Sequence, residues 1–303
     1  MKTTTRLSLA VGALGIASAF AIGSPRNPAP GDLVDTAVNA GRFNVLAAAL
    51  DAADLVGALQ GPGPFTVFAP TDSAFAKLPP GTLDFLLQPE NKQALTDILL
   101  YHVVPGEFFA ADVLAKSQLD TLNGQRLDIS LSQGQPFVDQ AQIWVTDVAS
   151  TNGVIHVIDE VLLPSTLNVL QTAEAAGTFQ TLLAAVDAAD LTAALGTPGP
   201  FTVLAPTDDA FAALPPGLVT ALLKPENKGR LVSILTYHVI PDRVFSDEAL
   251  AAGSATTLQG NTVDFSLNGT DAFVNGAKLL ATDIDASNGV VHVIDAVLIP
   301  PTF

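Results

Sequence analysis

The four histidines of this 303-residue chain are the side chains best suited to do chemistry near neutral pH. His102 and His156 lie 54 residues apart, and His238 and His292 repeat that spacing further along the chain. An imidazole can act as a general base or bind a metal ion, and two of them could share one site. The spacing alone is therefore compatible with two equivalent reactive centres.

The residues next to these histidines favour a structural role. His156 lies between Ile155 and Val157 in an alternating pattern, so a strand here would point the imidazole to the opposite face from both neighbours. His102 follows the predicted end of a helix, where an imidazole commonly bonds a backbone carbonyl or a nearby carboxylate. We expect structural hydrogen bonds for both histidines, and the same for their repeats in the second half of the chain.

Other catalytic and binding motifs are missing or incomplete in the sequence. There is no cysteine, which excludes disulfides, a thiol nucleophile and a thiolate metal site. No nucleophile elbow, phosphate loop or dinucleotide-binding glycine run is present. Residues 283–289 suggest a calcium loop, but an EF-hand needs glycine sixth and glutamate twelfth, where Asn288 and Ile294 stand. We predict a turn there, and no catalytic residue, cofactor or metal site in the chain.

The histidines belong to sequence blocks that occur twice. Phe65–Asp72 returns as Phe201–Asp208, Tyr101–Pro105 as Tyr237–Pro241, and Asn152–Asp159 as Asn288–Asp295. Each pair is offset by 136 residues, so no insertion or deletion separates the blocks. A period this long indicates a duplicated domain, because solenoid repeats run about 20 to 50 residues.

Helical patterns open each copy and must position these blocks. In the first copy they cover residues 32–40 and 43–53, and Pro62-Gly63-Pro64 then leads into a short strand at 65–68. Thr71 is a good helix N-cap, with Asp72 favourable in the first turn, and Thr207 and Asp208 mirror them. Further helices are predicted from Leu83 and from Pro89.

Strand patterns follow the Tyr101 block. Residues 122–125 read as a hairpin turn between strands at 119–121 and 127–131. Short strands at 137–138 and 143–145 follow, and a long apolar strand at 154–163 ends the unit. Helices followed by hairpin-linked strands predict an α+β unit built around an antiparallel sheet.

The three duplicated blocks resemble the signature motifs of the fasciclin domain, and they appear in the same order in both copies. The resemblance covers essentially the whole chain after its first residues. It implies two tandem fasciclin-like domains, each a β-sandwich flanked by helices. It also implies an extracellular or cell-surface role in interaction and adhesion, without catalysis.

The tyrosine–histidine block has two interpretations. In animal members of the fasciclin family this region has been associated with integrin binding, which would name Tyr101, His102, Tyr237 and His238 as partner contacts. The apolar residues on both sides of the block favour burial and a structural role instead. For Thr71, Asp72, His156, Thr207, Asp208 and His292 we expect a structural role.

The first residues and the overall charge predict export. The apolar run from Leu7 to Gly23 follows Lys2 and Arg6, as in a secretory signal peptide. The net charge of −17 argues against nucleic acid and against adsorption to anionic lipid. We expect a secreted protein located outside the cell, at the cell surface or in a periplasm, with no membrane insertion once the signal is removed.

These expectations define the predicted organisation and function. Residues 1–23 form the signal peptide, 24–31 a short linker, 32–164 the first domain and 165–303 the second. The predicted function is non-catalytic cell adhesion or matrix binding, with an extracellular protein or glycan as the partner. The alternatives are an extracellular polymer hydrolase, for which carboxylates are plentiful, and a small-molecule or carbohydrate-binding protein.

Overall fold

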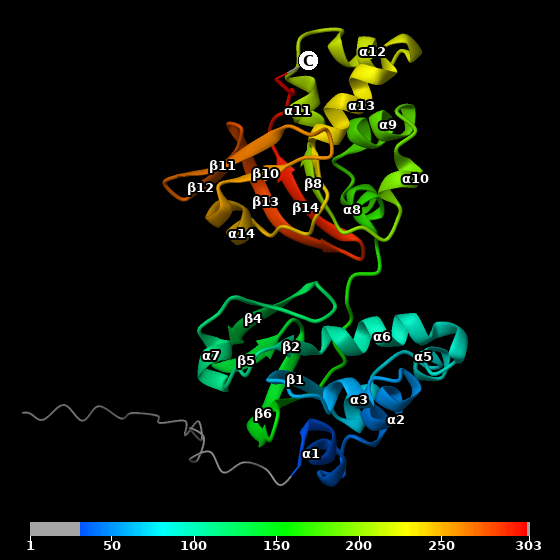
Figure 1. Cartoon of the computed structure of the whole chain (residues 1–303), viewed down its shortest axis with the longest axis vertical. Helices are drawn as coiled ribbons and strands as arrows, with labels where there is room; N and C mark the ends of the chain where they lie inside the picture. The colour runs from blue at the N-terminus through cyan, green and yellow to red at the C-terminus, as the bar shows by residue number, and fades with distance from the viewer. Residues whose placement is uncertain (1–30, 302–303) are drawn as a thin grey trace, which may run out of the picture.

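The computed structural model describes residues 31–301, which form two units of the same architecture stacked along the long axis of the molecule (Figure 1). The predicted signal peptide, and all of the predicted linker except Gly31, lie outside the described residues. Each unit has one seven-stranded sheet with helices packed against it. The predicted α+β class and the tandem arrangement are confirmed.

The elements of the first unit are α1 (Leu33–Asn39), α2 (Asn44–Ala52), α3 (Val56–Leu59), β1 (Phe65–Pro70), α4 (Asp72–Phe75), α5 (Thr82–Leu86), the 3₁₀ helix η1 (Pro89–Asn91), α6 (Lys92–Tyr101), β2 (Val103–Pro105), α7 (Ala110–Leu114), β3 (Gln118–Asp120), β4 (Arg126–Ser132), β5 (Gln135–Val138), β6 (Ala141–Ser150) and β7 (Gly153–Ile158). The unit contains the predicted elements in the predicted order, together with α3, β2 and α7, which were not predicted.

The second unit repeats these elements in the same order. They are α8 (Val169–Ala176), α9 (Gln180–Ala188), α10 (Thr192–Leu195), β8 (Phe201–Pro206), α11 (Asp208–Ala212), α12 (Leu218–Leu222), η2 (Pro225–Asn227), α13 (Lys228–Tyr237), β9 (Val239–Ile240), α14 (Ser246–Ala252), β10 (Ser254–Thr256), β11 (Thr262–Asn268), β12 (Asp271–Val274), β13 (Ala277–Ala286) and β14 (Gly289–Ile294).

The sheet order is β2-β1-β7-β6-β5-β4-β3 in the first unit, and the equivalent strands follow the same order in the second, β9-β8-β14-β13-β12-β11-β10. All pairs are antiparallel except β1 with β7 and β8 with β14, which run parallel. The prediction of an antiparallel sheet is wrong for this central pair. Its two strands are the first and last of the unit, so the long connection that parallel strands require is available.

The last strand is also shorter than predicted, because β7 ends at Ile158 and not at Leu163. Two interactions of the following residue, Asp159, mark the end: its carboxylate accepts a hydrogen bond from Gln142 N at 2.8 Å and pairs with Lys77. Residues 161–162 are nevertheless buried, so the apolar pattern reports packing of a loop and not a longer strand.

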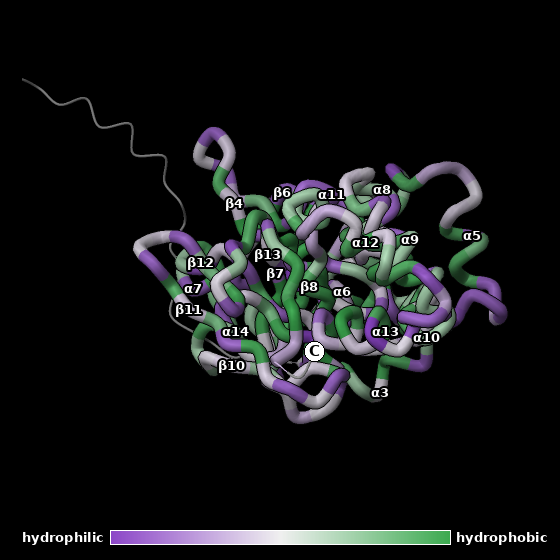
Figure 2. Tube along the Cα trace, turned by 90° about the horizontal axis from the view of Figure 1, so that it is seen from above, coloured by the Kyte–Doolittle hydropathy of each residue, from purple (hydrophilic) through white to green (hydrophobic). Residues whose placement is uncertain are grey.

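The sheet of each unit is buried on both faces. In the first unit one face packs against the helices through Ile155 and Val157, and the other lines a second cluster that contains Phe68 and Ile158. The hydropathy view shows hydrophobic segments around β7 and β8 in the middle of the molecule, with hydrophilic segments toward its edge (Figure 2). Residues on either face of β7 therefore lie in an apolar environment.

Candidate interaction site

The tyrosine–histidine block lies where the longest helix of each unit meets the sheet. Tyr101 is the last residue of α6, His102 is its C-cap, and Val103 begins β2. Tyr101 is 6% exposed and His102 is 2% exposed. The equivalent residues of α13, Tyr237 and His238, are buried as well. These four side chains therefore point into the units and do not form an exposed surface.

His102 connects the end of α6 to the loop that follows β7. Its Nδ1 lies 2.7 Å from the carbonyl of Ile98, one turn earlier in the helix, and its Nε2 accepts a hydrogen bond from Leu162 N at 3.0 Å. Nδ1 must carry the proton, since the partner is a carbonyl. Burial lowers the pKa of His102 to about 4, so the imidazole is neutral at physiological pH. His238 repeats this arrangement, and its pKa is also lowered to about 4 by burial.

His156 connects β7 to the start of α7. Its Nε2 lies 2.8 Å from the carbonyl of Phe108, and its Nδ1 accepts from Asp147 N at 3.4 Å. The imidazole packs against the ring of Phe68 in a tilted arrangement, with the two ring centroids 5.4 Å apart. Burial lowers the pKa of His156. In the second unit His292 bonds Val244 O and Asp283 N in the same way.

The tyrosine hydroxyls have different partners in the two units. Tyr237 Oη donates to the carbonyl of Thr262 at 2.9 Å and accepts from Asn275 Nδ2 at 2.8 Å. Tyr101 Oη has two acceptors, Arg126 O at 3.0 Å and Asp139 Oδ2 at 2.9 Å, but only one proton. Burial raises the pKa of Asp139, and burial together with the Asp139 charge raises the pKa of Tyr101.

The threonine–aspartate pairs fix the helix that follows the first strand. Thr71 Oγ1 accepts from Ala74 N at 3.2 Å, which caps α4. Asp72 accepts from Val45 N at 2.8 Å, which ties α4 to α2. Thr207 caps α11 through Ala210 N, and Asp208 accepts from Thr181 N at 2.7 Å. These backbone hydrogen bonds lower the pKa of Asp208.

The chemistry open to these residues is limited, because both ring nitrogens of every histidine are used inside its own unit. A metal ion or a substrate proton would have to displace one of these bonds. Across residues 31–301, no three histidines or carboxylates lie close enough to hold a metal ion. The structure does not bring the two histidines of a unit into one site: His102 bonds Leu162 and His156 bonds Phe108.

The residues of the suspected calcium loop, 283–289, form hydrogen bonds within the second unit. Asp283 Oδ1 accepts from Ser246 N at 2.7 Å, which holds the start of α14 against β13. Asp285 accepts from Arg243 Nη1 at 2.9 Å. Asn288 is the second residue of the turn between β13 and β14, and its side chain donates to the carbonyls of Leu195 and Thr197.

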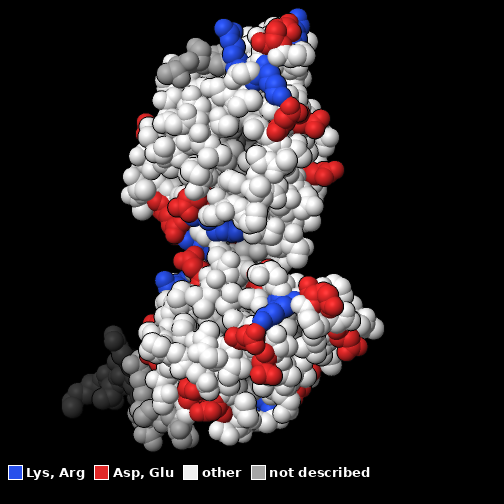
Figure 3. Space-filling view, turned by 45° about the vertical axis from the view of Figure 1, so that its right-hand side comes forward, with Lys and Arg blue, Asp and Glu red and all other residues white. Residues whose placement is uncertain are grey.

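A polar cleft between the two units was not predicted from the sequence. One part of it, about 430 Å³, is bounded by Tyr101, Asp128 and Asp285, among others. A second part, about 520 Å³, lies beside Lys116 and Asp247. Acidic and basic side chains gather in the narrow region between the two units, which we call the waist (Figure 3). In the sequence, the residues of the cleft cannot be distinguished from ordinary surface charges. The one sequence feature that could have indicated a contact between the units is that several of these residues differ between the two copies.

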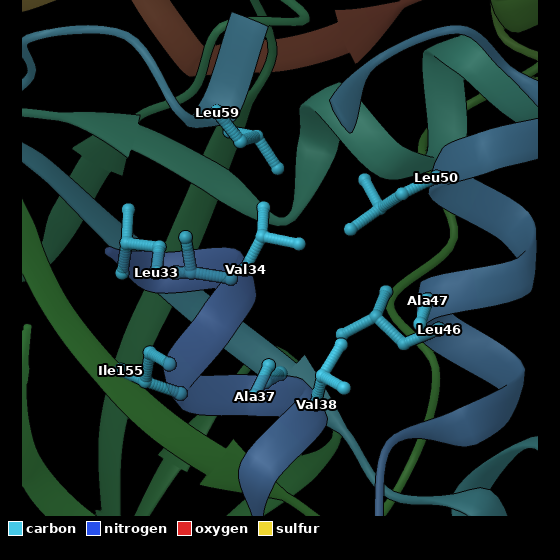
Figure 4. A pocket seen from close by; sticks show the side chains of 11 residues that line it. Leu33, Val34, Ala37, Val38, Leu46, Ala47, Leu50, Leu59 and Ile155 are labelled. Atoms are coloured by element: carbon cyan, nitrogen blue, oxygen red, sulfur yellow. The ribbon is translucent and has the colours of Figure 1, made fainter. Parts of the chain in front are cut away.

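An apolar pocket lies in the first unit between α1, α2, α3 and the sheet (Figure 4). Eleven residues line it, among them Leu33, Leu46 and Ala47, and its volume is about 20 Å³, little more than one water molecule needs. Leu183 of the second unit stands where the first has Ala47, which gives the first unit less side-chain volume here. The pocket is a packing gap and not a ligand site.

Comparison with known proteins places the chain in a family. The fasciclin domain family matches residues 41–164 and again residues 177–300. Protein sll1483 of Synechocystis sp. is 44% identical over 168 residues, which is 55% of this chain and 89% of that protein. Transforming growth factor-beta-induced protein ig-h3 of Sus scrofa is 35% identical over 247 residues, 80% of this chain. The chain spans only 35% of the length of that protein.

A solved structure titled as a FAS1 domain pair from the insect cell adhesion molecule Fasciclin I covers 88% of this chain and 98% of its own, with 19% identity and a TM-score of 0.43. The protein belongs to the fasciclin family and contains two fasciclin domains in tandem. Among its described residues, no helix has both the length and the apolar character needed to cross a membrane.

Proposed function

We propose that this protein is an exported, non-catalytic interaction module that mediates adhesion to a cell surface or to extracellular matrix. Its family membership supports this proposal, together with the predicted signal peptide. The observation that carries it is the role of the histidines. The residues best suited to chemistry are buried, neutral and hydrogen-bonded to backbone within each unit, which leaves the outer surfaces for binding.

In this proposal the partner is an extracellular protein or a glycan. The domains extend from 32 to 164 and from 165 to 303, and the protein acts outside the cell, at the cell surface or in a periplasm. Tyr101, His102, Tyr237 and His238 shape the unit and do not touch the partner, because they are buried. Two similar units raise avidity when both can engage at once.

Binding assays test the proposal directly. Residues 24–303 and each single domain are immobilised at equal molar density, and attachment of host cells, matrix proteins and glycan arrays is measured. We expect the pair to retain more than either domain. The variant His102→Gln serves as a control, since a buried side chain should change stability and leave binding by the folded protein unchanged. Absence of binding together with turnover of an extracellular polymer would contradict the proposal and support a hydrolase.

A further inference from the structure

The two units are connected by a very short free segment. Ser165 is held on the first unit by reciprocal hydrogen bonds with Gln125, at 2.7 and 3.0 Å. Leu167 is already held on the second unit, because its carbonyl accepts from Ser287 N at 2.8 Å. Only Thr166 lies between these two attachments. The connection therefore permits rotation at very few bonds, and contacts at the waist can determine the orientation.

Arg126 is the central contact at that waist. It begins β4 of the first unit, yet its side chain is only 8% exposed because the second unit covers it. The guanidinium binds both carboxylate oxygens of Asp247, at 2.7 and 3.3 Å, and lies 3.8 Å from the ring centroid of Phe245. Its backbone N–H donates to Asp285 at 2.9 Å, and Asp120 of its own unit holds the guanidinium from the other side. Bidentate arginine–carboxylate pairs of this kind fix geometry as well as position.

Without this arginine, the two facing surfaces would repel each other. Three carboxylates from each unit line the cleft: Asp120, Asp128 and Asp139 from the first, and Asp247, Asp283 and Asp285 from the second. Arg243 compensates Asp285 within the second unit. Lys116 of the first unit also lines the cleft. Among residues 31–301, Arg126 forms an ion pair from one unit to the other, with Asp247.

The charged residues of this contact are specific to their copy, whereas Phe245 has Phe109 at the equivalent position. At the positions offset by 136 residues, Thr262 replaces Arg126, Ala111 replaces Asp247 and Ala149 replaces Asp285. The structural hydrogen bonds of the two histidine pairs, in contrast, are the same in both copies. The contact therefore belongs to the joint between the units and not to the fold of either unit.

We propose that Arg126 acts as an inter-unit clamp, which holds the two fasciclin domains in one fixed orientation against the repulsion of their facing carboxylates. The ion pair with Asp247 and the stacking on Phe245 supply the attraction. The short connection makes one such contact sufficient to define the arrangement.

Distance measurements between two spin labels test this proposal. The chain has no cysteine, so Gln88→Cys and Ala175→Cys provide one exposed label in each unit. We expect a narrow distance distribution in the otherwise unaltered protein. Arg126→Thr, which introduces the residue that the second copy has at this position, should broaden the distribution and shift it to longer distances. Raising the salt from about 0.1 to 1 M shortens the Debye length from about 10 to 3 Å, which should reverse part of that shift.

Lys278→Gln is the matched control. It also removes one positive charge and introduces the residue of the other copy, Gln142, but it breaks only the Lys278–Asp271 pair within the second unit. Its distribution should equal that of the parent. The proposal is wrong if Arg126→Thr leaves the distances unchanged, or if both variants broaden them equally. Should Arg126→Thr fail to fold, as judged by circular dichroism, Asp247→Ala tests the same contact from the other unit with the same expected broadening.

Discussion

At the scale of single residues, the four histidines show how a side chain suited to catalysis can serve as a fixed structural connector. Each imidazole donates to a carbonyl and accepts from a backbone N–H, so its tautomer is determined by its neighbours. Sequence alternation predicted correctly that His156 faces away from Ile155 and Val157. It could not show that the opposite face is also buried, because that depends on the second apolar cluster, whose residues come from distant parts of the unit.

Replacing His156 by Ala should lower the free energy of unfolding of the first unit by roughly 1–3 kcal/mol, because Phe108 O and Asp147 N lose a buried partner. Trp144, the single tryptophan, lies in the first unit and reports its unfolding in urea by fluorescence. His292→Ala is the control, and should shift this signal much less. Full stability combined with loss of an activity would refute the structural role of His156.

The difference between Asp139 and Asn275 gives a second prediction. The amide of Asn275 donates to Tyr237, whereas Asp139 and Arg126 O compete for the one proton of Tyr101. Asp139→Asn should therefore stabilise the first unit by about 1 kcal/mol at neutral pH. The gain should shrink in acid, because protonated Asp139 can donate as well. Urea unfolding of this variant and of the reciprocal Asn275→Asp at pH 7 and 4.5 measures both effects; a loss of stability in Asp139→Asn at pH 7 would contradict the hydrogen-bond assignment.

At the scale of elements, local sequence signals predicted helix starts and turns correctly, whereas the pairing of strands far apart in the sequence was not predicted. Thr71 and Pro89 marked helix starts, and residues 122–125 marked the turn between β3 and β4, because caps and tight turns depend on a few adjacent residues. The parallel pairing of β1 with β7 joins residues far apart in the sequence, and no local pattern specifies it. The cleft was missed for the same reason, since its two walls come from different units.

The cap of α4 can be tested on its own. Thr71→Ala should cost about 1 kcal/mol of stability, because Ala74 N loses its side-chain acceptor at the start of the helix. Thr71→Ser keeps the hydroxyl and should retain most of the stability. Urea unfolding followed by Trp144 fluorescence measures both variants, and equal midpoints for Ala and Ser would show that the cap does not contribute.

At the scale of the whole molecule, buried titratable groups determine the response to acid. The pKa of His102 and of His238 is about 4 in the folded protein and near 6.5 when unfolded. The unfolded chain therefore binds more protons between these values, and each group contributes stability that is present above pH 6.5 and lost as the pH falls toward 4. Asp285 acts in the opposite direction: burial raises its pKa to about 6, so its contribution is present at low pH and lost as the pH rises through 6.

The histidines outnumber Asp285, so stability should fall on acidification from pH 7 to 5, by up to about 1.4 kcal/mol per pH unit for each fully buried histidine. Urea midpoints at several pH values measure this slope. The double variant His102→Gln and His238→Gln should flatten it. A stability that rises steadily from pH 7 to 5 would show that carboxylates such as Asp285 dominate.

The asymmetry of the waist also limits how many units can associate. The contact at the waist joins the arginine surface of one unit to the aspartate surface of the other, so it is heterologous. Heterologous contacts propagate into filaments when every copy presents both surfaces. In this chain the second unit has Thr262 at the position of Arg126, and the first unit has Ala111 and Ala149 at the positions of Asp247 and Asp285.

We therefore expect unaltered chains not to join end to end through this contact. Restoring the missing partners with Thr262→Arg, Ala111→Asp and Ala149→Asp should allow whole chains to join end to end, with a mass by light scattering that increases with concentration. The unaltered chain, with its surfaces matched only at the internal joint, should keep the mass of a monomer under the same conditions. In the unaltered chain the arginine and its aspartates meet once, at the joint between the two units.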